Sequence, residues 1–226
     1  MPFKFDWPAA TIDGMWISGR EVTGNATWSS VLTGIPTGFG GGTNVASIKT
    51  EKMTSGRTTW RKNWRLHVQM SYNKNLFVGG QNVPVNAILH NATWIMYRTN
   101  ALHVDDKAFN YRIYKGTWTA TPAAGLANPY NQFTSTVYAQ ARDMLLASPY
   151  NPTDNAFFKF TIDNNAKMLE YFETQLANDD VIRLTFRNEC DWGSSEPTGI
   201  NRTDIAGSAY TLNGSTGFRP TWSTAL

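Results

Sequence analysis

Three histidines and one cysteine are the residues of this sequence best suited to acid–base, nucleophilic or metal chemistry. His67, His90 and His103 do not stand at the spacing of a helical metal site or of a catalytic triad. Cys190 lies between two acidic residues, whose charges would raise the pKa of its thiol and lower its reactivity. We therefore expect no catalytic residues and a protein that is not an enzyme.

Two pairs of adjacent carboxylates, Asp105–Asp106 and Asp179–Asp180, are the next candidates for chemistry. Both pairs lie in expected turns, where aspartate side chains commonly hydrogen bond to nearby backbone groups. Adjacent carboxylates could also hold a structural calcium ion if further oxygen ligands were close. A glycosidase would need two carboxylates across a cleft, which the spacing does not indicate. We expect no metal and no cofactor, with structural calcium as the alternative.

Aromatic side chains in or beside loops are better candidates for binding than the ionisable groups. A flat aromatic face can stack on a sugar ring or anchor a protein interface. The alternative for each of these residues is packing in the core of a β-sandwich. The candidates for contact with a glycan or a protein partner are Tyr130, Tyr150, Trp192, Phe218 and Trp222.

A basic stretch at residues 57–65 is interleaved with Trp60 and Trp64. Such an alternation could form a platform for nucleic acid. It also fits the wet and dry faces of a single strand. The formal net charge of the chain is only +3, and no run of five basic residues occurs. We therefore favour the strand and expect no nucleic-acid partner.

The strongest periodicity, at residues 157–188, predicts a strand, a short helix and a second strand. Apolar residues alternate over 157–162 and again over 181–188. Between them, Asp163 and Asn164 can cap a helix whose apolar residues recur every three or four positions. A short helix between two such strands is typical of a plug on an antiparallel sandwich.

The remaining elements follow from weaker patterns. His67 is expected on the polar side of its strand, and residues 133–147 show a weak helical pattern. The dipeptide Asn213-Gly214 predicts a hairpin that joins strands at 205–212 and 218–223. Alternation predicts further strands at 60–72, 87–98 and 109–118, and long loops are expected at 119–132 and 189–203.

The first 43 residues are expected to form an extended, glycine-rich arm outside the main domain. The glycine run at 34–43 lacks the Lys-Ser/Thr ending of a phosphate-binding loop, so a flexible loop is favoured. Such an arm would lie on its own domain or on a neighbouring subunit. We expect a chain without residues 1–43 to stay folded but no longer to assemble. The residues expected to anchor the arm are Trp7, Trp16 and Trp28.

Length and composition fit one large β domain at residues 44–226. The chain has 226 residues, with 18 glycines, 10 prolines and only 16% charged residues. Its single cysteine excludes an internal disulfide, and we expect neither a signal peptide nor a membrane span. We predict an all-β fold: an antiparallel β-sandwich of the jelly-roll type with one or two short helices and an extended N-terminal arm.

The order of these segments resembles the single jelly-roll domains named after their DNRLRE motif, which are close in shape to many carbohydrate-binding modules. NATWIM (91–96) is similar to the "A-x-L" strand of that family, and YRIYKGTW (111–118) to its aromatic strand ending in tryptophan. Residues 158–175 and VIRLTF (181–186) resemble its strand, helix and "G-L-x-L" strand. GFRPTW (217–222) is similar to its closing "RP-x-L" strand.

The likeness covers about residues 44–226, and the first 43 residues have no counterpart. Asn178-Asp179-Asp180 stands where the family has a glycine after the helix, and the acidic residue before the closing hairpin is absent. The resemblance implies a jelly-roll fold and a role in carbohydrate binding.

We predict a non-enzymatic structural component of a virus particle, such as a phage capsid decoration, fibre or tail protein. Low charge, a glycine-rich arm and an Asn-, Thr- and Gly-rich β body are typical of such proteins. The expected partners are copies of the chain and other virion proteins, without membrane or nucleic acid, and the expected location is the virion after synthesis in the host cytoplasm. The alternative is a carbohydrate-binding module or receptor-binding domain for a surface glycan, and a polysaccharide hydrolase is third.

Overall fold

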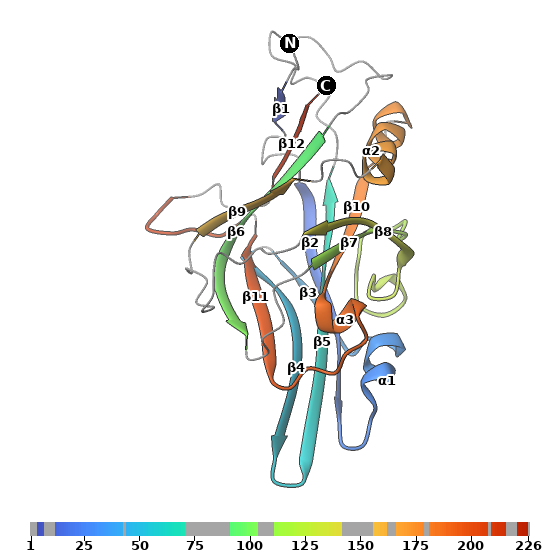
Figure 1. Ribbon diagram of the computed structural model, residues 1–226, viewed down its shortest axis with the longest axis vertical. Helices are drawn as coiled ribbons and strands as arrows, with labels where there is room; N and C mark the ends of the chain where they lie inside the picture. Colours follow the sequence, from blue (N-terminus) through green and yellow to red (C-terminus); the bar gives the residue numbers. More distant parts are fainter. Residues whose placement is uncertain are drawn as a thin grey trace.

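The protein is an all-β, antiparallel structure, as the sequence predicted (Figure 1). Its described residues form three short α-helices, where one or two short helices were expected. Within the described residues, twelve strands join in one hydrogen-bonded network, and nine of them follow the order β1-β12-β6-β11-β4-β5-β10-β7-β8. The computed structural model describes residues 4–6, 12–42, 44–70, 91–103, 111–141, 156–161, 166–178, 181–207, 209–215 and 221–225.

The elements have the following bounds. The strands are β1 (Lys4–Asp6), β2 (Ile12–Thr23), β3 (Gly38–Gly41), β4 (Val45–Ser55), β5 (Thr58–Met70), β6 (Asn91–His103), β7 (Tyr111–Gly116), β8 (Phe133–Ala141), β9 (Ala156–Thr161), β10 (Ile182–Asn188), β11 (Ile200–Ala206) and β12 (Thr221–Ala225). The helices are α1 (Trp28–Thr33), α2 (Ala166–Asn178), α3 (Glu189–Trp192) and the 3-10 turn η2 (Gly125–Ala127). None of the described helices has the length and apolar character to cross a membrane.

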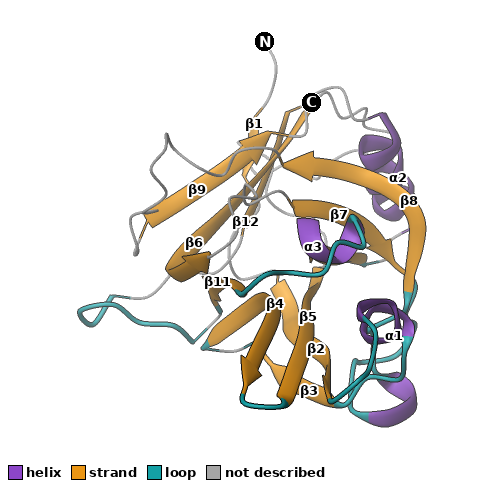
Figure 2. Cartoon of the chain, turned by 60° about the horizontal axis from the view of Figure 1, so that its bottom comes forward, coloured by secondary structure: helices purple, strands orange, loops and turns teal. Residues whose placement is uncertain are grey.

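Strand β5 is where the two layers of the sandwich meet. One of its edges pairs with β2 from Trp60 to Met70. Its other edge pairs with β4 up to Trp64 and with β10 from Leu66 onward. The sheet therefore divides at Arg65: β4 continues to β11 on one side, and β10 continues to β7 and β8 on the other. Figure 2 shows β4 and β11 on one side of this division and β7 and β8 on the other.

Strand β6 branches in a similar way. One edge pairs with β9, and the other pairs with β12 up to Ile95 and with β11 from Arg98. Two branching strands let one network of hydrogen bonds fold over on itself and enclose apolar side chains between its layers. The core residues that are almost fully buried include Ile48, Leu66, Val68, Ile113, Leu184, Phe186 and Ile205.

The β4–β5 hairpin projects beyond the rest of the structure (Figure 1). A two-residue turn joins Ser55 to Thr58, and Gly56 opens this turn with a φ of 59°, a conformation that suits glycine. Every residue from Met53 to Thr58 is exposed. The end of the hairpin therefore buries little surface within the chain.

The expected arm is instead part of the sheet over residues 12–41. Strand β2 pairs with β5, and β3 pairs with β2, so hydrogen bonds cross the predicted boundary at residue 43. The prediction of an irregular arm is wrong because the glycines serve close packing. The ring of Trp64 lies against Gly19 and Gly38, where a Cβ atom would overlap it. Trp7 lies outside the described residues.

Helix α1 ties the same segment to the core. Trp28, Val31 and Leu32 are buried and pack with Cys190 in a small apolar cluster. The indole N–H of Trp28 also donates to the backbone oxygen of Cys190 at 3.2 Å. Trp28 was predicted to anchor an assembly arm and is a core residue instead. Trp16 lies half-buried on β2, with its ring against Gly14.

The strand–helix–strand prediction for residues 157–188 is confirmed by β9, α2 and β10. Met168, Leu169 and Phe172 lie on the buried face of α2. However, β9 pairs with β6, whereas β10 lies between β5 and β7. The helix therefore connects strands that are separated in the sheet. The strands expected at 60–72 and 109–118 are also confirmed, as β5 and β7.

Two predictions were wrong in the type or pairing of the element. The weakly helical segment at 133–147 begins as strand β8, because its pairing with β7 outweighs a weak helical pattern. The Asn213-Gly214 turn forms, with positive φ at both residues and a bridge between Leu212 and Ser215. The turn does not connect two strands that pair with each other as predicted, because β11 and β12 each pair with β6 instead.

Removing residues 1–43 is expected to unfold the domain, in contrast to the expectation from sequence. The deletion exposes one edge of β5 and removes Trp28, Val31 and Leu32 from the core, where each large truncation alone costs about 2–5 kcal/mol. Circular dichroism and urea titration of residues 44–226 check this. A cooperative transition at the midpoint of the full chain would contradict it.

Candidate functional site

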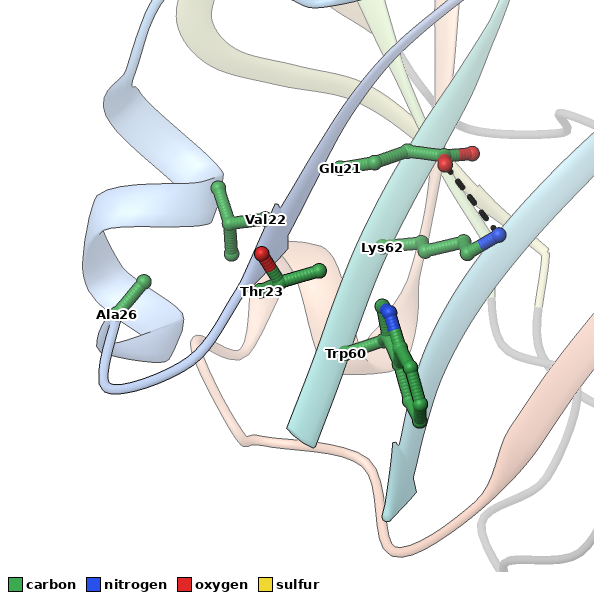
Figure 3. Close-up of a pocket in the computed structure, with 6 residues that line it drawn as sticks. All are labelled: Glu21, Val22, Thr23, Ala26, Trp60 and Lys62. Atoms are coloured by element: carbon green, nitrogen blue, oxygen red, sulfur yellow. Dashed lines mark ion pairs between the residues drawn. The ribbon is translucent and has the colours of Figure 1, made fainter. Parts of the chain in front are cut away.

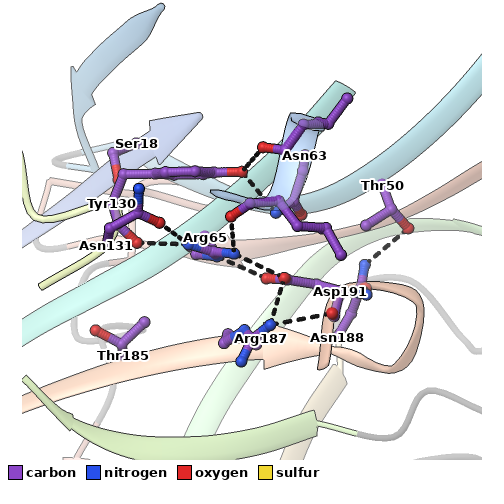
Figure 4. Close-up of polar contacts among 12 residues, drawn as sticks. Ser18, Thr50, Asn63, Arg65, Tyr130, Asn131, Thr185, Arg187, Asn188 and Asp191 are labelled. Atoms are coloured by element: carbon purple, nitrogen blue, oxygen red, sulfur yellow. Dashed lines mark hydrogen bonds and ion pairs between the residues drawn. The ribbon is translucent and has the colours of Figure 1, made fainter. Parts of the chain in front are cut away.

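A buried ion pair between Arg65 and Asp191 lies where the sheet divides (Figure 4). Nε of Arg65 donates to Oδ2 of Asp191 at 2.7 Å, and Nη2 donates to Oδ1 at 2.8 Å. Both side chains are only 1% exposed. Arg187 of β10 donates to the same Oδ1 at 2.8 Å. One carboxylate therefore binds guanidinium groups from both β5 and β10.

Helix α3 holds Asp191 in place. Asn188, the last residue of β10, caps this helix by accepting the backbone N–H of Asp191 at 3.1 Å. Its side-chain amide donates to Oγ1 of Thr50 on β4 at 3.0 Å. Asn188 thus links β10 to β4 across the division of the sheet.

The remaining donors of Arg65 bind α1 and the loop before β8. Nη1 donates to the backbone oxygen of Tyr130 at 2.6 Å and to Oδ1 of Asn131 at 3.0 Å. Nη2 donates to the backbone oxygen of Leu32 at 3.1 Å. With the two bonds to Asp191, these contacts match the five N–H donors of a guanidinium group. A charge that would otherwise be costly to bury is therefore fully hydrogen bonded.

Tyr130 is part of this buried cluster. Its hydroxyl donates to the backbone oxygen of Val31 at 2.8 Å and accepts from Nδ2 of Asn63 at 2.9 Å. Its ring lies 4.0 Å from the guanidinium of Arg65. Burial raises the pKa of Tyr130 to about 12. The prediction that Tyr130 is an exposed contact residue is wrong, because its loop folds under α1.

Burial and charge have opposite effects on the carboxyl of Asp191. Burial alone disfavours the ionised form, but Arg65 and Arg187 outweigh it and hold the pKa of Asp191 well below its usual range. The pKa of Arg65 is raised in turn, because Asp191 overcomes the effect of burial. The ion pair is thus present throughout the physiological pH range.

His67 forms a second buried contact two residues further along β5. Nε2 lies 2.6 Å from Oγ of Ser18, and Nδ1 lies 3.0 Å from Oγ1 of Thr185. Its ring packs edge-on against Trp118. Burial, and then the charge of Arg65, lower the pKa of His67 well below its ordinary value. The side of β5 that was predicted to be polar and to face solvent is therefore buried at Arg65 and His67.

A serine beside a histidine can be activated as a nucleophile. Ser18, His67 and Thr185 are all 0% exposed, so no substrate reaches them in this conformation. Cys190 is also buried and packs beneath α1. These groups therefore stabilise the fold in the described structure and are not presented for a reaction.

A second carboxylate, that of Glu196, binds both strands of the hairpin. Lys52 of β4 and Arg61 of β5 face each other and both pair with Glu196, with Nζ of Lys52 at 2.6 Å. Burial opposes ionisation, but the hydrogen bonds from Lys52 and Arg61 lower the pKa of Glu196 overall. The segment after β10 therefore holds the hairpin at two points, through Asp191 at its base and Glu196 further out.

A hollow of about 650 Å³ lies beside the hairpin, on the side of β2 (Figure 3). Oε2 of Glu21 lies 3.3 Å from Nζ of Lys62, and the indole N–H of Trp64 donates to Oε1 of Glu21 at 3.1 Å. Trp60 is half-buried next to this pair. The hollow is lined by Glu21, Val22, Thr23, Ala26, Trp60 and Lys62.

The predicted contact residues do not come together in one described site. Trp192 is half-buried, and the guanidinium of Arg112 lies 3.6 Å from its ring centroid. Trp222 lies on β12, opposite Trp94 of β6. The side chain of Trp222 lies outside the described residues, as do Tyr150, Phe218 and both aspartate pairs considered for calcium. Within the described part of the chain, no group of three His, Cys, Asp or Glu side chains could hold a metal ion.

The sequence did not indicate the roles of Arg65, Asp191 and Trp60, although residues 57–65 were considered as a possible platform for nucleic acid. The alternation at 57–65 shows that a strand has two faces but not that Arg65 lies on a buried face. Asp191 follows Cys190 in what reads as a loop, and only the fold brings it to Arg65. The tryptophan spacing of this strand was the available signal for Trp60.

Comparison with protein-family models and with curated protein sequences found no match to this chain.

Replacing Asp191 with asparagine is expected to destabilise the protein by about 3–5 kcal/mol, because the charge of Arg65 stays buried without its counterion. Urea unfolding measures the loss. Glu196→Gln is the matched control, since that carboxyl is 30% exposed and exposed pairs contribute about 1 kcal/mol or less. Equal losses in the two variants would contradict the role given to Asp191.

Stability is expected to fall as the pH decreases below about 6.5. The unfolded chain then binds a proton at His67 that the folded protein excludes, so the free energy of unfolding falls by up to about 1.4 kcal/mol per pH unit from this residue. Asp191 adds a loss in the same direction below about pH 4. Urea unfolding of the wild type and His67→Gln between these two pH values tests the first effect. The same slope in both proteins would refute it.

Proposed function

We propose that the chain is a non-enzymatic structural component of a phage particle, such as a capsid decoration, fibre or tail protein. It works by packing against copies of itself and other virion proteins. The observation that supports this most is the use of the buried ionisable groups. Arg65 and Asp191 form a buried ion pair, and His67 forms buried hydrogen bonds, so these groups hold the fold together.

A projecting hairpin that is held by two carboxylates agrees with such a role. Asp191 and Glu196 tie the hairpin to the segment after β10, and its end is exposed from Met53 to Thr58. A protein that works by packing needs a shape that holds when a partner binds, because a preformed surface loses less conformational entropy.

Large exposed apolar side chains are the best candidates for contact with a partner. Ile35 is 81% exposed in the loop before β3, and Leu102 is 49% exposed on β6. Apolar side chains of this size are favourable anchors when a partner covers them. We expect contacts through these residues to contribute to assembly.

Glycan recognition is the second candidate function, and one observation favours it. The hollow beside the hairpin combines a half-buried tryptophan with a carboxylate and an ammonium group. Together with the jelly-roll resemblance, this arrangement supports a receptor-binding role on a particle.

Changing Ile35 and Leu102 to serine is expected to reduce incorporation into particles by about tenfold or more, because two anchors of the packing surface are lost. Complementation of a phage that lacks the gene for this chain, followed by quantitative mass spectrometry of purified particles, measures incorporation.

Thr54→Ser is the matched control, because Thr54 is exposed and the serine that replaces it still carries a hydroxyl group. A chain that remains monomeric in solution and is absent from wild-type particles would contradict the proposal. Normal incorporation of the double variant would also contradict the assigned surface.

A further inference from the structure

We propose that the hollow beside the hairpin binds a neutral hexose unit of a glycan, with Trp60 as the stacking surface and Glu21 and Lys62 as hydrogen-bond partners (Figure 3). This inference rests on the second proposed function, glycan recognition, and is independent of the role in particle structure.

Trp60 provides the apolar surface of the site. On β5 it lies between Thr23 of β2 and Met53 of β4, near the exposed end of the hairpin. It is only half-buried and lines the hollow, so it is not enclosed in the core. A flat aromatic ring of this kind can cover the C–H face of a pyranose and leave the hydroxyl groups free to hydrogen bond.

Glu21 and Lys62 supply the polar partners next to that ring. They face each other across β2 and β5, two positions along from the pair of Thr23 and Trp60. Because side chains alternate between the two faces of a strand, all four side chains lie on the same face of the sheet. A carboxylate accepts hydrogen bonds and an ammonium donates them. The pair can therefore bind adjacent hydroxyl groups of one sugar ring.

The acidic partner is held before a ligand arrives. The indole N–H of Trp64 and the ammonium of Lys62 both bind the Glu21 carboxylate. The backbone N–H of Glu21 donates to Oγ1 of Thr37 at 2.8 Å. Such fixation lowers the entropy that is lost on binding.

The shape and charge of the hollow favour this class of ligand. Its volume lies in the usual range of small-ligand sites, about 300–1,000 Å³. Opposite charges side by side give no net attraction to an anion such as a phosphate. A wholly apolar ligand would have to desolvate both charged groups, which is unfavourable. A polyol with one apolar face can pack on the ring of Trp60 and hydrogen bond to Glu21 and Lys62 at the same time.

The test uses the full chain with maltotriose, cellotriose and mannotriose as soluble neutral probes. Titration is followed by the indole N–H signals in two-dimensional NMR and by calorimetry. We expect at least one probe to shift the Trp60 signal and saturate. Trp60→Ala and Lys62→Met should each weaken that binding by about tenfold or more.

Met53→Ala is the matched control, because Met53 faces Trp60 from β4 but does not line the hollow. It should leave saccharide affinity unchanged and confirm that the folded hairpin tolerates substitution there. Saccharide binding that survives Trp60→Ala overturns the proposal, as does the absence of a saturable shift with all three probes. Loss of self-association in both Trp60→Ala and Met53→Ala, without saccharide binding, overturns it in favour of a protein contact.

The two proposals fail in different ways. A chain that is incorporated into particles but binds none of the probes contradicts this inference alone. A chain that binds a saccharide through Trp60 but is absent from particles contradicts the structural role alone.

Discussion

Two opposite charges buried where a sheet divides must satisfy each other, and this constraint shapes the structure around Arg65 and Asp191. Removing such groups from water costs several kcal/mol per ion unless the geometry is good and the remaining donors are bound. Here the contact is bidentate, and the other donors of Arg65 reach α1 and the loop before β8. The pair therefore specifies how these segments meet, because other arrangements would leave a charge unpaired.

The hairpin and the hollow beside it are arranged around that junction. Strand β5 pairs with β4 up to Trp64 and with β10 from Leu66 onward, so the base of the hairpin lies at Arg65, where the ion pair forms. Asn188 joins β10 to Thr50 beside it, and Glu196 holds the hairpin further out. The hollow with Trp60 lies on the side of the same hairpin. The hollow is thus mounted on an element whose base is fixed by buried charge.

Periodicity in the sequence predicted an element correctly where the local pattern alone determines whether the segment is a strand or a helix. The alternation at 157–162 and 181–188 and the helical spacing between them correspond to β9, α2 and β10. The same reasoning failed where contacts with another part of the chain determine the structure of a segment. Gly19 and Gly38 lie in the segment that was expected to form an extended arm, yet they allow the ring of Trp64 to lie close to the backbone of the sheet. Residues 133–141 form a strand because β7 lies beside them.

The candidate site was harder to predict for the same reason. Alternation along β5 separates two faces but cannot show that the face with Arg65 and His67 is covered by other elements. Asp191 is distant in sequence from Arg65, and its role appears only when α3 is placed against β5. Tyr130 sits in a loop rich in turn-forming residues, which indicated exposure. The loop instead folds inward, so that the backbone oxygen of Tyr130 accepts a hydrogen bond from Arg65 and its ring packs against the guanidinium.

Native-state hydrogen exchange tests the central claim most directly. If the ion pair holds the junction, the amides of α3 and of β5 near Arg65 should exchange only through global unfolding, with the same free energy as the core of β10. Exchange of these amides through local opening, at a free energy well below that of the core, would contradict it. The junction would then be a consequence of the fold and not the constraint on which it depends.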